Sequence, residues 1–428
     1  MKKIYFSIFL VYINFLVAIS QTTPAPKQQG EIVITGANIH VGNGQLISNG
    51  ILAFTNGKIS YVGSDISKVS ANARRIDAKD KEIYPGFIAL GSSLGLNEIE
   101  QVKATIDESE LGAMNANVRS IIAYNTDSRV QNTLRTNGVL MAEIAPKGAV
   151  ISGQSSFVQL DAWNWEDASL YSDIAIHLTW PSPYRYSGWW AEPGSSSTND
   201  KYEKDVARIK NFFDEAFAYS KNPPAMDKNL RYEAMLDIWS GKKKLIIHAS
   251  LAKAIISAIG FAKNYGITPI IAEAEDAWRI SDFIKENKVS ILLGESHNLP
   301  LREDDDTDQI YKNAKLLYDA GILYAMKVNG FWQQRNLPFQ VGQTVAYGVP
   351  KEAAIASITA NVAKIFDLNA IGTLEVNKDA TFFVSSGDAM DMIGNQVELA
   401  FIQGREIDLD NHQKALYRKY HEKYRIQN

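Results

Sequence analysis

Residues 245 to 293 read LIIHASLAKAIISAIGFAKNYGITPIIAEAEDAWRISDFIKENKVSILL, and this stretch decides the fold class. Three short apolar runs, at 245–249, 267–272 and 289–293, each have the length of a buried strand. The segments between them have helical apolar spacing, and the first of these ends at Gly266. Strands separated by helices in this way predict parallel pairing with right-handed crossovers.

The same alternation of strand and helix extends in both directions. Downstream, a helix over 308–320 precedes a strand at 322–326, and Pro350 opens a further helix. Upstream, apolar runs predict four more strands, at 83–90, 121–124, 139–144 and 174–178. About eight strands suit a closed (β/α)8 barrel better than an open sheet. We therefore expect an α/β fold with a TIM-like barrel over residues 83–371.

Both ends of the chain alternate apolar and polar residues, which indicates antiparallel strands rather than barrel units. Residues 31–62 alternate in this way and are broken by Asn-Gly turn signals. The alternation returns after the last predicted barrel helix. We expect 31–82 and 372–410 to form one composite β-sandwich, followed by a C-terminal helical tail over 411–428.

The first twenty residues have the pattern of a secretory signal peptide. Lys2 and Lys3 precede an apolar run, and Ala18-Ile19-Ser20 forms a small-residue cleavage site before Gln21. Cleavage of a signal peptide over 1–20 predicts a secreted or periplasmic protein. The alternative is an uncleaved membrane anchor, although the run is short and imperfect for a span.

The composition excludes several classes of site. No cysteine occurs in the chain, so it has no disulfides, thiolate metal ligands or cysteine nucleophile. The 48 acidic residues outnumber the 44 lysines and arginines, which gives a formal net charge of −4. A chain with this balance and no basic footprint is not predicted to bind nucleic acid.

Three of the six histidines lie at or after the ends of predicted strands. His177 and His248 lie at the carboxyl ends of two predicted strands and His297 follows a third, and barrels of this class carry their active sites at the carboxyl ends of the strands. Together with Glu273, these imidazole and carboxylate groups suit zinc or another divalent ion. Glu273 and His297 are also the candidates for a catalytic role. The alternative is that these histidines only hydrogen-bond neighbouring loops.

Polar residues in other predicted rim loops are candidates for binding a substrate carboxylate or amide. Gln154 lies in a glycine-containing segment after the third predicted strand, and Arg335 and Asn336 follow the eighth. Gly148 and Gly153 allow a close approach of the backbone. The alternative is that these loops pack against one another.

Short motifs occur in order along the chain: ANIHVGNG at 37–44, YPGFI at 84–88, IGTLE at 371–375 with KDAT at 378–381, and IQGRE at 402–406. Together they resemble the amidohydrolase superfamily, in its imidazolonepropionase-like branch.

The resemblance implies hydrolysis of C–N bonds at a metal centre that uses a His-x-His pair of the first strand. The corresponding positions here are Gly91 and Ser93, so the usual zinc ligands are missing. The resemblance also implies an aspartate after the eighth strand, where this chain has Asn329.

The missing ligands lead to two functional expectations. The first is a pseudoenzyme that binds a small-molecule ligand without catalysis, or that acts as a subunit in a homo-oligomer or in a heteromer with an active amidohydrolase. No cofactor is expected in that case. The second is a working hydrolase of cyclic amides or peptide-like compounds with a rebuilt mononuclear zinc site that uses rim histidines.

Overall fold

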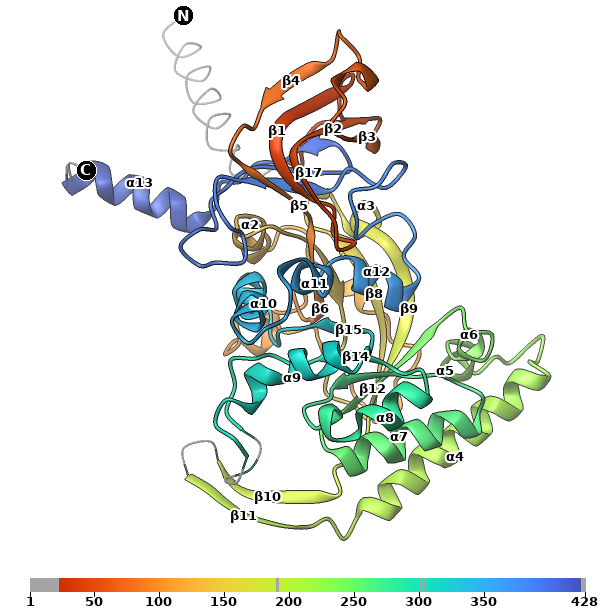
Figure 1. The fold of residues 1–428 in the computed structure, drawn as a ribbon. Coiled ribbons are helices and arrows are strands. Elements are labelled where there is room, and N and C mark those ends of the chain that lie inside the picture. The colour runs from red at the N-terminus through yellow and green to blue at the C-terminus, as the bar shows by residue number, and fades with distance from the viewer. Residues whose placement is uncertain (1–22, 190–191, 301, 303–304, 425–428) are drawn as a thin grey trace, which may run out of the picture.

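The computed structural model describes residues 23–189, 192–300, 302 and 305–424, and the predicted signal peptide at 1–20 lies outside them. Two large sheets dominate the fold, one at the top of the view in Figure 1 and one in the middle. The upper sheet is made by both ends of the chain, and the middle sheet forms a barrel. The fold is therefore mixed α/β.

The upper sheet joins the two chain ends through hydrogen bonds. Its strands are β1 (Ile32–His40), β2 (Leu46–Thr55), β3 (Lys58–Gly63), β4 (Arg74–Asp77), β5 (Glu82–Pro85), β16 (Phe382–Ser385), β17 (Val397–Ile402) and β18 (Arg405–Glu406). Their order is β18-β17-β16-β5-β1-β2-β3, with β4 paired to β1. The join is the antiparallel pair β5–β16, in which Tyr84 faces Phe383. The composite sandwich stays a prediction, because the pairing establishes one shared sheet rather than two facing layers.

The second sheet is an eight-stranded, nearly closed barrel. Its strands, in spatial order, are β6 (Phe87–Ser92), β7 (Val139–Ile144), β8 (Ile151–Gln159), β9 (Ser169–Thr179), β12 (Lys244–Ala249), β13 (Ile270–Glu273), β14 (Ser290–Leu293) and β15 (Tyr324–Met326). The gap between β15 and β6 is bridged by backbone bonds, from Met326 to Ser357 and from Ile88 to Ile358. The predicted TIM-like barrel is confirmed at this coarse level.

One barrel strand differs from the prediction. The segment at 121–124 was expected to be a strand, but it lies in and directly after a 3-10 helix, η3 (Ser120–Ala123). The strand that takes its place in the count is β8, which pairs antiparallel with both β7 and β9. A four-residue apolar run is too short to separate strand from helix by periodicity. The serines and glycine of β8 gave it the composition of a loop.

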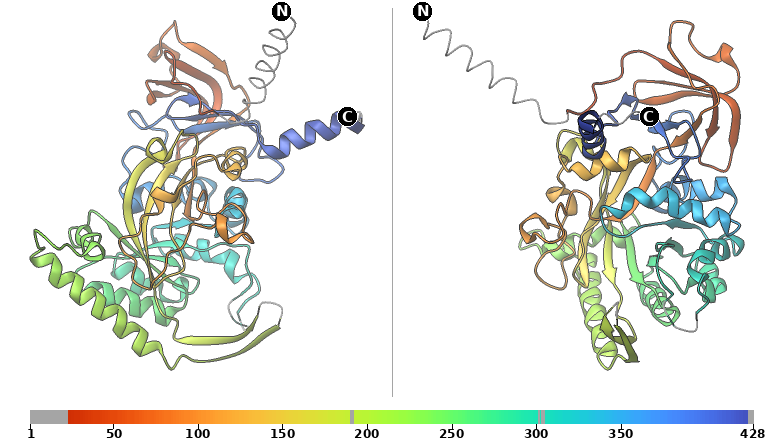
Figure 2. Two further views of the ribbon diagram at one scale, coloured as in Figure 1. Left: turned by 180° about the vertical axis from the view of Figure 1, so that it is seen from behind. Right: turned by 90° about the vertical axis from the view of Figure 1, so that its left-hand side faces the viewer.

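Helices and short 3-10 turns surround the barrel (Figures 1 and 2). The α-helices are α2 (Arg129–Arg135), α3 (Trp165–Ala168), α4 (Tyr202–Lys221), α5 (Leu230–Glu233), α6 (Leu236–Trp239), α7 (Ala252–Asn264), α8 (Ser281–Glu286), α9 (Gln309–Asp319), α10 (Leu337–Ala346), α11 (Lys351–Ala356), α12 (Ala360–Phe366) and α13 (His412–Tyr424). The remaining 3-10 turns are η1 (Ile66–Lys68), η2 (Lys103–Thr105), η4 (Ala277–Ile280) and η5 (Gln333–Asn336).

Two elements stand out from the body. The hairpin of β10 (Tyr184–Trp189) and β11 (Glu192–Thr198) extends below the barrel, and α13 projects sideways near the terminal sheet (Figures 1 and 2). In the part of the chain that the structure describes, no helix is both long and apolar enough to cross a membrane.

The barrel interior is filled by one apolar cluster. Phe157 meets Phe366 edge to face there, with ring centroids 5.0 Å apart. The cluster members on barrel strands are Ile88, Leu90, Met141, Phe157, Ala175, Ile246, Ile270, Ala272, Leu292 and Ala325. Alternate residues of a strand point to the same side, so residues two positions nearer the carboxyl end also face inward. This rule places Glu143, His177 and His248 inside the mouth of the barrel.

Candidate functional site at the barrel mouth

A linear chain of hydrogen bonds crosses the barrel mouth. Oε1 of Glu143 on β7 lies 3.2 Å from Nε2 of His177 on β9. Nδ1 of His177 lies 3.0 Å from Nε2 of His248 on β12. Nδ1 of His248 then lies 2.8 Å from Oε1 of Glu273, at the end of β13. Two imidazoles are thus held in series between two carboxyl groups.

Glu143 is completely buried and is surrounded by hydrogen-bond donors. The Gly91 N–H donates to Oε2 at 2.9 Å, and the Ser155 hydroxyl donates to Oε1 at 2.6 Å. Burial alone raises the pKa of Glu143, but the contacts with His177, Ser155 and Gly91 outweigh it. They hold the pKa below its usual value of 4.5. Glu143 is therefore a carboxylate at neutral pH.

Glu273 reaches the mouth from an unusual backbone conformation. Ala272 faces the barrel interior, so strand alternation would direct the next side chain outward. Glu273 instead has a φ of 69°, in the left-handed region that residues other than glycine rarely adopt. Its carboxylate thereby meets His248 and Lys327. Such strain persists only where the surrounding contacts over-determine the conformation.

Lys327, directly after β15, places an ammonium group in the mouth. Its side chain is only 3% exposed. Nζ donates to Oε1 and Oε2 of Glu273 at 2.8 and 2.7 Å, and to Oδ1 of Asn329 at 2.9 Å. On the β6 side, a Cβ atom added to Gly91 would lie 3.0 Å from Cε of Lys327. The lysine therefore occupies space that any side chain at position 91 would need.

These contacts set the charges of Glu273 and His248. Burial raises the pKa of Glu273, but the Lys327 ammonium and the contact with His248 more than offset it and hold the pKa far below 4.5. Burial lowers the pKa of His248 below its usual 6.5, because it outweighs the contact with Glu273. Both side chains are 24% exposed, so this end of the chain of hydrogen bonds faces solvent. At neutral pH, Glu273 is ionised and His248 is neutral.

The second position of the missing histidine pair also borders a lysine. Nζ of Lys147 donates to the Ser93 hydroxyl at 3.4 Å and lies 3.9 Å from a carboxylate oxygen of Glu108. Burial lowers the pKa of Lys147, and the nearby charge of Lys327 acts in the same direction. Both positions where the resemblance implies metal-binding histidines are thus next to cationic side chains.

The residues in the mouth do not fit a bound metal ion. A catalytic zinc needs about three protein ligands and an open position for water. All four ring nitrogens of His177 and His248 are engaged in the hydrogen-bonded chain, and Gly91 offers no ligand. The Lys327 ammonium also holds both oxygens of Glu273. Across the described ranges, no group of three His, Asp or Glu side chains is placed to hold a metal ion.

The third rim histidine lies apart from the other two. His297 is exposed in a groove whose lining includes Lys351 and Asp388. Its ring meets Tyr311 edge to face, with centroids 6.4 Å apart, and its backbone N–H donates to Gln340. The structure therefore brings His177 and His248 together and leaves His297, proposed as ligand or catalyst, outside their contact.

Gln154 and Arg335, two of the predicted substrate-binding residues, make contacts away from the mouth. Gln154 precedes the inward-facing Ser155 on β8, so it points to the outer wall, where it accepts from Nζ of Lys243 at 2.5 Å. The backbone carbonyl of Arg335 accepts from Asn137, which precedes β7 and lies at the opposite end of the barrel. Asn336 is next to Arg335 in η5.

Sequence reasoning missed three residues of the mouth. Glu143 is the only charged residue in the run VLMAEI, and Lys327 follows directly on the buried strand YAM. A charge at the carboxyl end of an apolar barrel strand was the available signal in both cases. Ser155 gives no such signal, because the serines and the glycine of β8 predict a loop.

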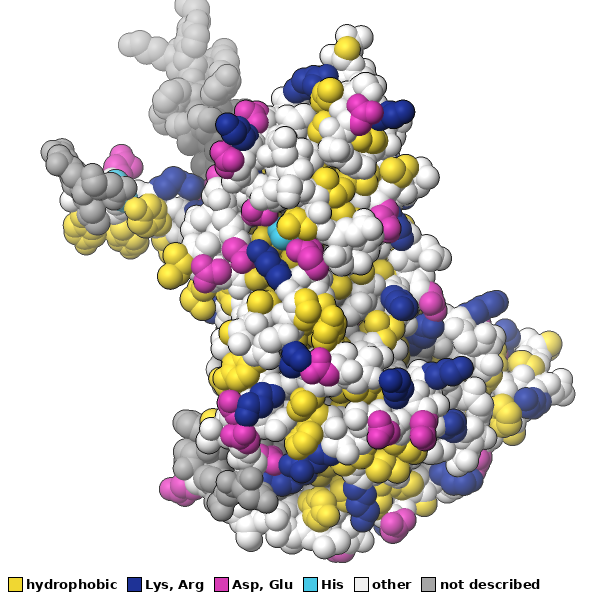
Figure 3. Space-filling view, viewed as in Figure 1, with side chains coloured by type: hydrophobic (Ala, Val, Ile, Leu, Met, Phe, Trp, Pro, Cys, Tyr) yellow, Lys and Arg dark blue, Asp and Glu magenta, His cyan; other side chains and the backbone are white. Residues whose placement is uncertain are grey.

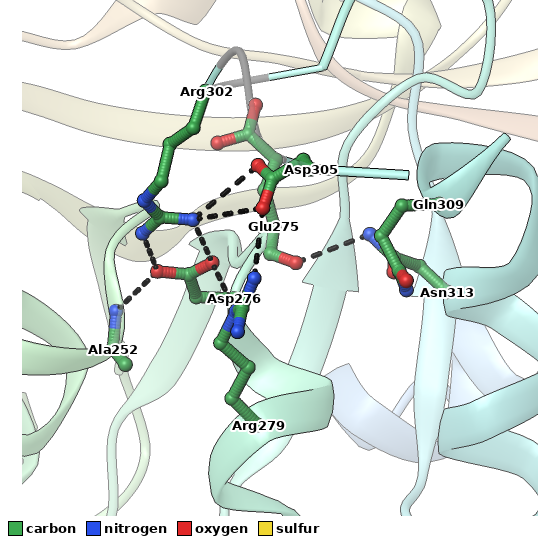
Figure 4. Close-up of polar contacts among 8 residues, drawn as sticks. All are labelled: Ala252, Glu275, Asp276, Arg279, Arg302, Asp305, Gln309 and Asn313. Atoms are coloured by element: carbon green, nitrogen blue, oxygen red, sulfur yellow. Dashed lines mark hydrogen bonds and ion pairs between the residues drawn. The ribbon is translucent and has the colours of Figure 1, made fainter. Parts of the chain in front are cut away.

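An ion-pair cluster fixes the loop after β14 to the loop after β13 (Figure 4). Arg302 donates to both carboxylate oxygens of Asp276, at 3.0 and 2.6 Å. Arg279 donates to Asp305 at 2.8 Å, and Asp276 also accepts from the N–H of Ala252, at the start of α7. Paired charges therefore hold the loops together at this part of the rim.

Solved structures of other proteins have a similar fold. An amidohydrolase from Thermotoga maritima MSB8 aligns with a TM-score of 0.76 and 20% sequence identity, over 88% of this chain and 99% of that chain. The two chains therefore share a fold. Molinate hydrolase aligns with a TM-score of 0.53 and 14% identity, over 89% and 95% of the two chains. Aspergillus niger ochratoxinase aligns with a TM-score of 0.52 and 12% identity, over 89% and 96%.

No family model and no curated protein sequence matches the chain. The amidohydrolase-type barrel predicted from the motifs is confirmed as a fold by the structural alignments. At these sequence identities a shared fold does not show a shared activity, because function depends on the residues of the site.

Proposed function

We propose that this chain is a non-catalytic member of the amidohydrolase superfamily, descended from its imidazolonepropionase-like branch. It binds a small-molecule ligand or acts as a subunit beside an active relative. The observation that carries this proposal is the Lys327 ammonium, which is bound to Glu273 and lies against Gly91. The position that would have to bind a metal is filled by the protein's own cation.

Metal-dependent hydrolysis of an amide requires a polarised carbonyl and an activated water. In this mouth, the carboxylates of Glu143 and Glu273 are already paired with internal donors, so neither is free to act as a base. The side chains that could replace missing ligands, at Ser93 and Asn329, contact Lys147 and Lys327. The charged groups of the mouth therefore pair with one another.

The projecting helix α13 supports a role as a subunit. Leu416, Tyr417, Tyr420 and Tyr424 share one side of it by helical spacing, and all four are exposed. Hydrophobic side chains gather on this helix in the space-filling view (Figure 3). Exposed tyrosines are typical of protein interfaces. Secretion or export to the periplasm remains part of the proposal and rests on the pattern at residues 1–20.

The alternative function is hydrolysis at a rebuilt mononuclear site, and the direct contact of His177 with His248 is the observation in its favour. One experiment decides between the two. The full chain is purified without chelator, its metal content is measured, and dihydrouracil, imidazolone and dipeptides are offered as substrates. We expect far less than one zinc ion per chain and no enzyme-like turnover. Stoichiometric metal, together with turnover abolished by His248→Ala, would overturn the proposal.

A further inference from the structure

The hydrogen-bonded chain in the mouth needs more protons than two neutral imidazoles supply. Its contacts join Glu143 to His177, His177 to His248, and His248 to Glu273, and each contact requires one N–H proton. A neutral imidazole carries a single N–H, and an ionised carboxylate only accepts. With both carboxylates ionised, the contacts are all satisfied only if the histidine pair carries one excess proton.

The charges beside the pair place this proton on His177, because the other partners of Glu143 are neutral whereas Glu273 is already paired with the Lys327 ammonium. As an imidazolium, His177 donates through Nε2 to Glu143 and through Nδ1 to Nε2 of His248. His248 then stays neutral and donates through Nδ1 to Glu273.

The charges of the mouth then balance. The carboxylates of Glu143 and Glu273 contribute two negative charges, and the His177 imidazolium and the Lys327 ammonium contribute two positive charges. Two further charged groups border the mouth from other loops. Lys147 touches it through Ser93, and Glu295 accepts from Asn329 at 3.3 Å.

The geometry points to a built-in charge of +2 that takes the place of a bound divalent cation. Lys327 contributes one positive charge, and the excess proton on the His177–His248 pair contributes the other. The seat of the Lys327 ammonium is a latent site for a hard divalent cation. This inference rests on the proposed function, because it explains how the mouth stays charge-balanced without a metal. Without Lys327, Oε2 of Glu273 and Oδ1 of Asn329 lose this donor, and Oε1 keeps only the hydrogen bond from His248. Hard cations prefer such oxygen ligands.

The first test removes the ammonium. Mn²⁺ is titrated into the full-length wild type, Lys327→Ala and Lys243→Ala, with binding followed by the paramagnetic resonance of free Mn²⁺. Lys243 is the matched control, because it is also partly buried and hydrogen-bonded but lies on the outer wall beside Gln154. We expect Lys327→Ala to bind Mn²⁺ at least about tenfold more tightly than the other two proteins. A folded Lys327→Ala protein with wild-type Mn²⁺ binding would overturn the latent site.

The second test needs no substitution, so it remains decisive if Lys327→Ala does not fold. Nitrogen NMR of the histidine rings in the wild type, near neutral pH, distinguishes an imidazolium from each neutral tautomer. We expect His177 to be protonated on both nitrogens and His248 on Nδ1 alone. Two neutral rings would overturn the excess proton.

Failure of the inference can be told from failure of the proposed function. Stoichiometric metal in the wild type would contradict the proposed function, and the inference would fall with it. A wild-type protein without metal, combined with neutral rings or with no gain of Mn²⁺ binding in Lys327→Ala, would contradict the inference alone.

Discussion

Two regions of this molecule hold histidine between carboxylates, and they differ in what surrounds the ring. At the joint between the terminal sheet and the barrel helices, His40 lies 2.9 Å from Glu82 and 2.6 Å from Glu352, and its ring stacks on Tyr84 at 4.2 Å. At the barrel mouth, two histidines lie in series, and a lysine supplies a further charge.

The difference separates a structural joint from an altered site. His40 links β5 to α11, so its contacts hold two parts of the fold together. The mouth instead gathers charged groups from several strands at the carboxyl ends, where barrels of this class place their chemistry. It also contains Glu273 in a left-handed backbone conformation, whereas His40 and its two glutamate partners have no such conformation. Histidine between carboxylates is thus not by itself evidence of a site.

The largest expected effect comes from Glu143→Gln, which tests whether the mouth depends on its buried charge. Glutamine offers one carbonyl acceptor and directs an amide donor at another donor, so Gly91, Ser155 or His177 loses its acceptor. Breaking a buried charged pair costs about 3–5 kcal/mol. Urea unfolding of variant and wild type should show this loss, and a loss below about 1 kcal/mol would contradict the assigned network.

Acidification should weaken the same region next. The pKa values of Glu143 and Glu273 lie below 4.5, so the stability they contribute is present above that pH and is lost as the pH falls through their folded values. The lowered pKa of His248 acts in the same direction, because folding favours its neutral form and this contribution declines as the pH falls below 6.5. The free energy of unfolding should therefore decrease on going from about pH 6.5 to pH 4.

Urea titrations across this range would measure the decrease, with Glu143→Gln as the comparison. Because the variant lacks one of the titrating carboxylates, its stability should depend less steeply on pH below about 4.5. Equal slopes in the two proteins would show that folding does not lower the pKa of Glu143.

A smaller effect is expected at the joint, from Glu352→Gln. The Glu352 side chain is 20% exposed, so water compensates part of the lost charge, and the amide keeps an acceptor or a donor for His40. The cost should be about 1–2 kcal/mol by urea unfolding. If Glu352→Gln costs as much stability as Glu143→Gln, then the deeper burial of the mouth and its Lys327 ammonium add no stability.

Much of the barrel could be predicted because its strands are buried apolar runs between helices. The run at 245–249 became β12, and the helix expected to end at Gly266 became α7. The antiparallel strand β8 was not predicted, because its three serines and Gly153 are not hydrophobic. They are buried because neighbouring strands cover them. Local composition does not report such burial.

The site could be predicted only in part, because side-chain direction depends on the backbone. His177 and His248 were found, since both lie on strands whose phase is clear. The sequence also indicates Glu273 as a candidate, but it does not reveal the left-handed backbone that turns this side chain into the mouth. Arg335 was assigned to the rim from its place after β15, but the chain carries it toward Asn137 at the other end of the barrel.

The smallest expected effect is at His297, and it sharpens the comparison because this residue shares the sequence signal of His177 and His248. Its ring is exposed and contacts Tyr311 rather than a carboxylate, so its removal leaves no buried charge unpaired. His297→Ala should change the free energy of unfolding by no more than about 0.5 kcal/mol. The nitrogen NMR signals of His177 and His248 should also stay at their wild-type positions. A shift of either signal would show that His297 is coupled to the mouth and would restore it as a member of the site.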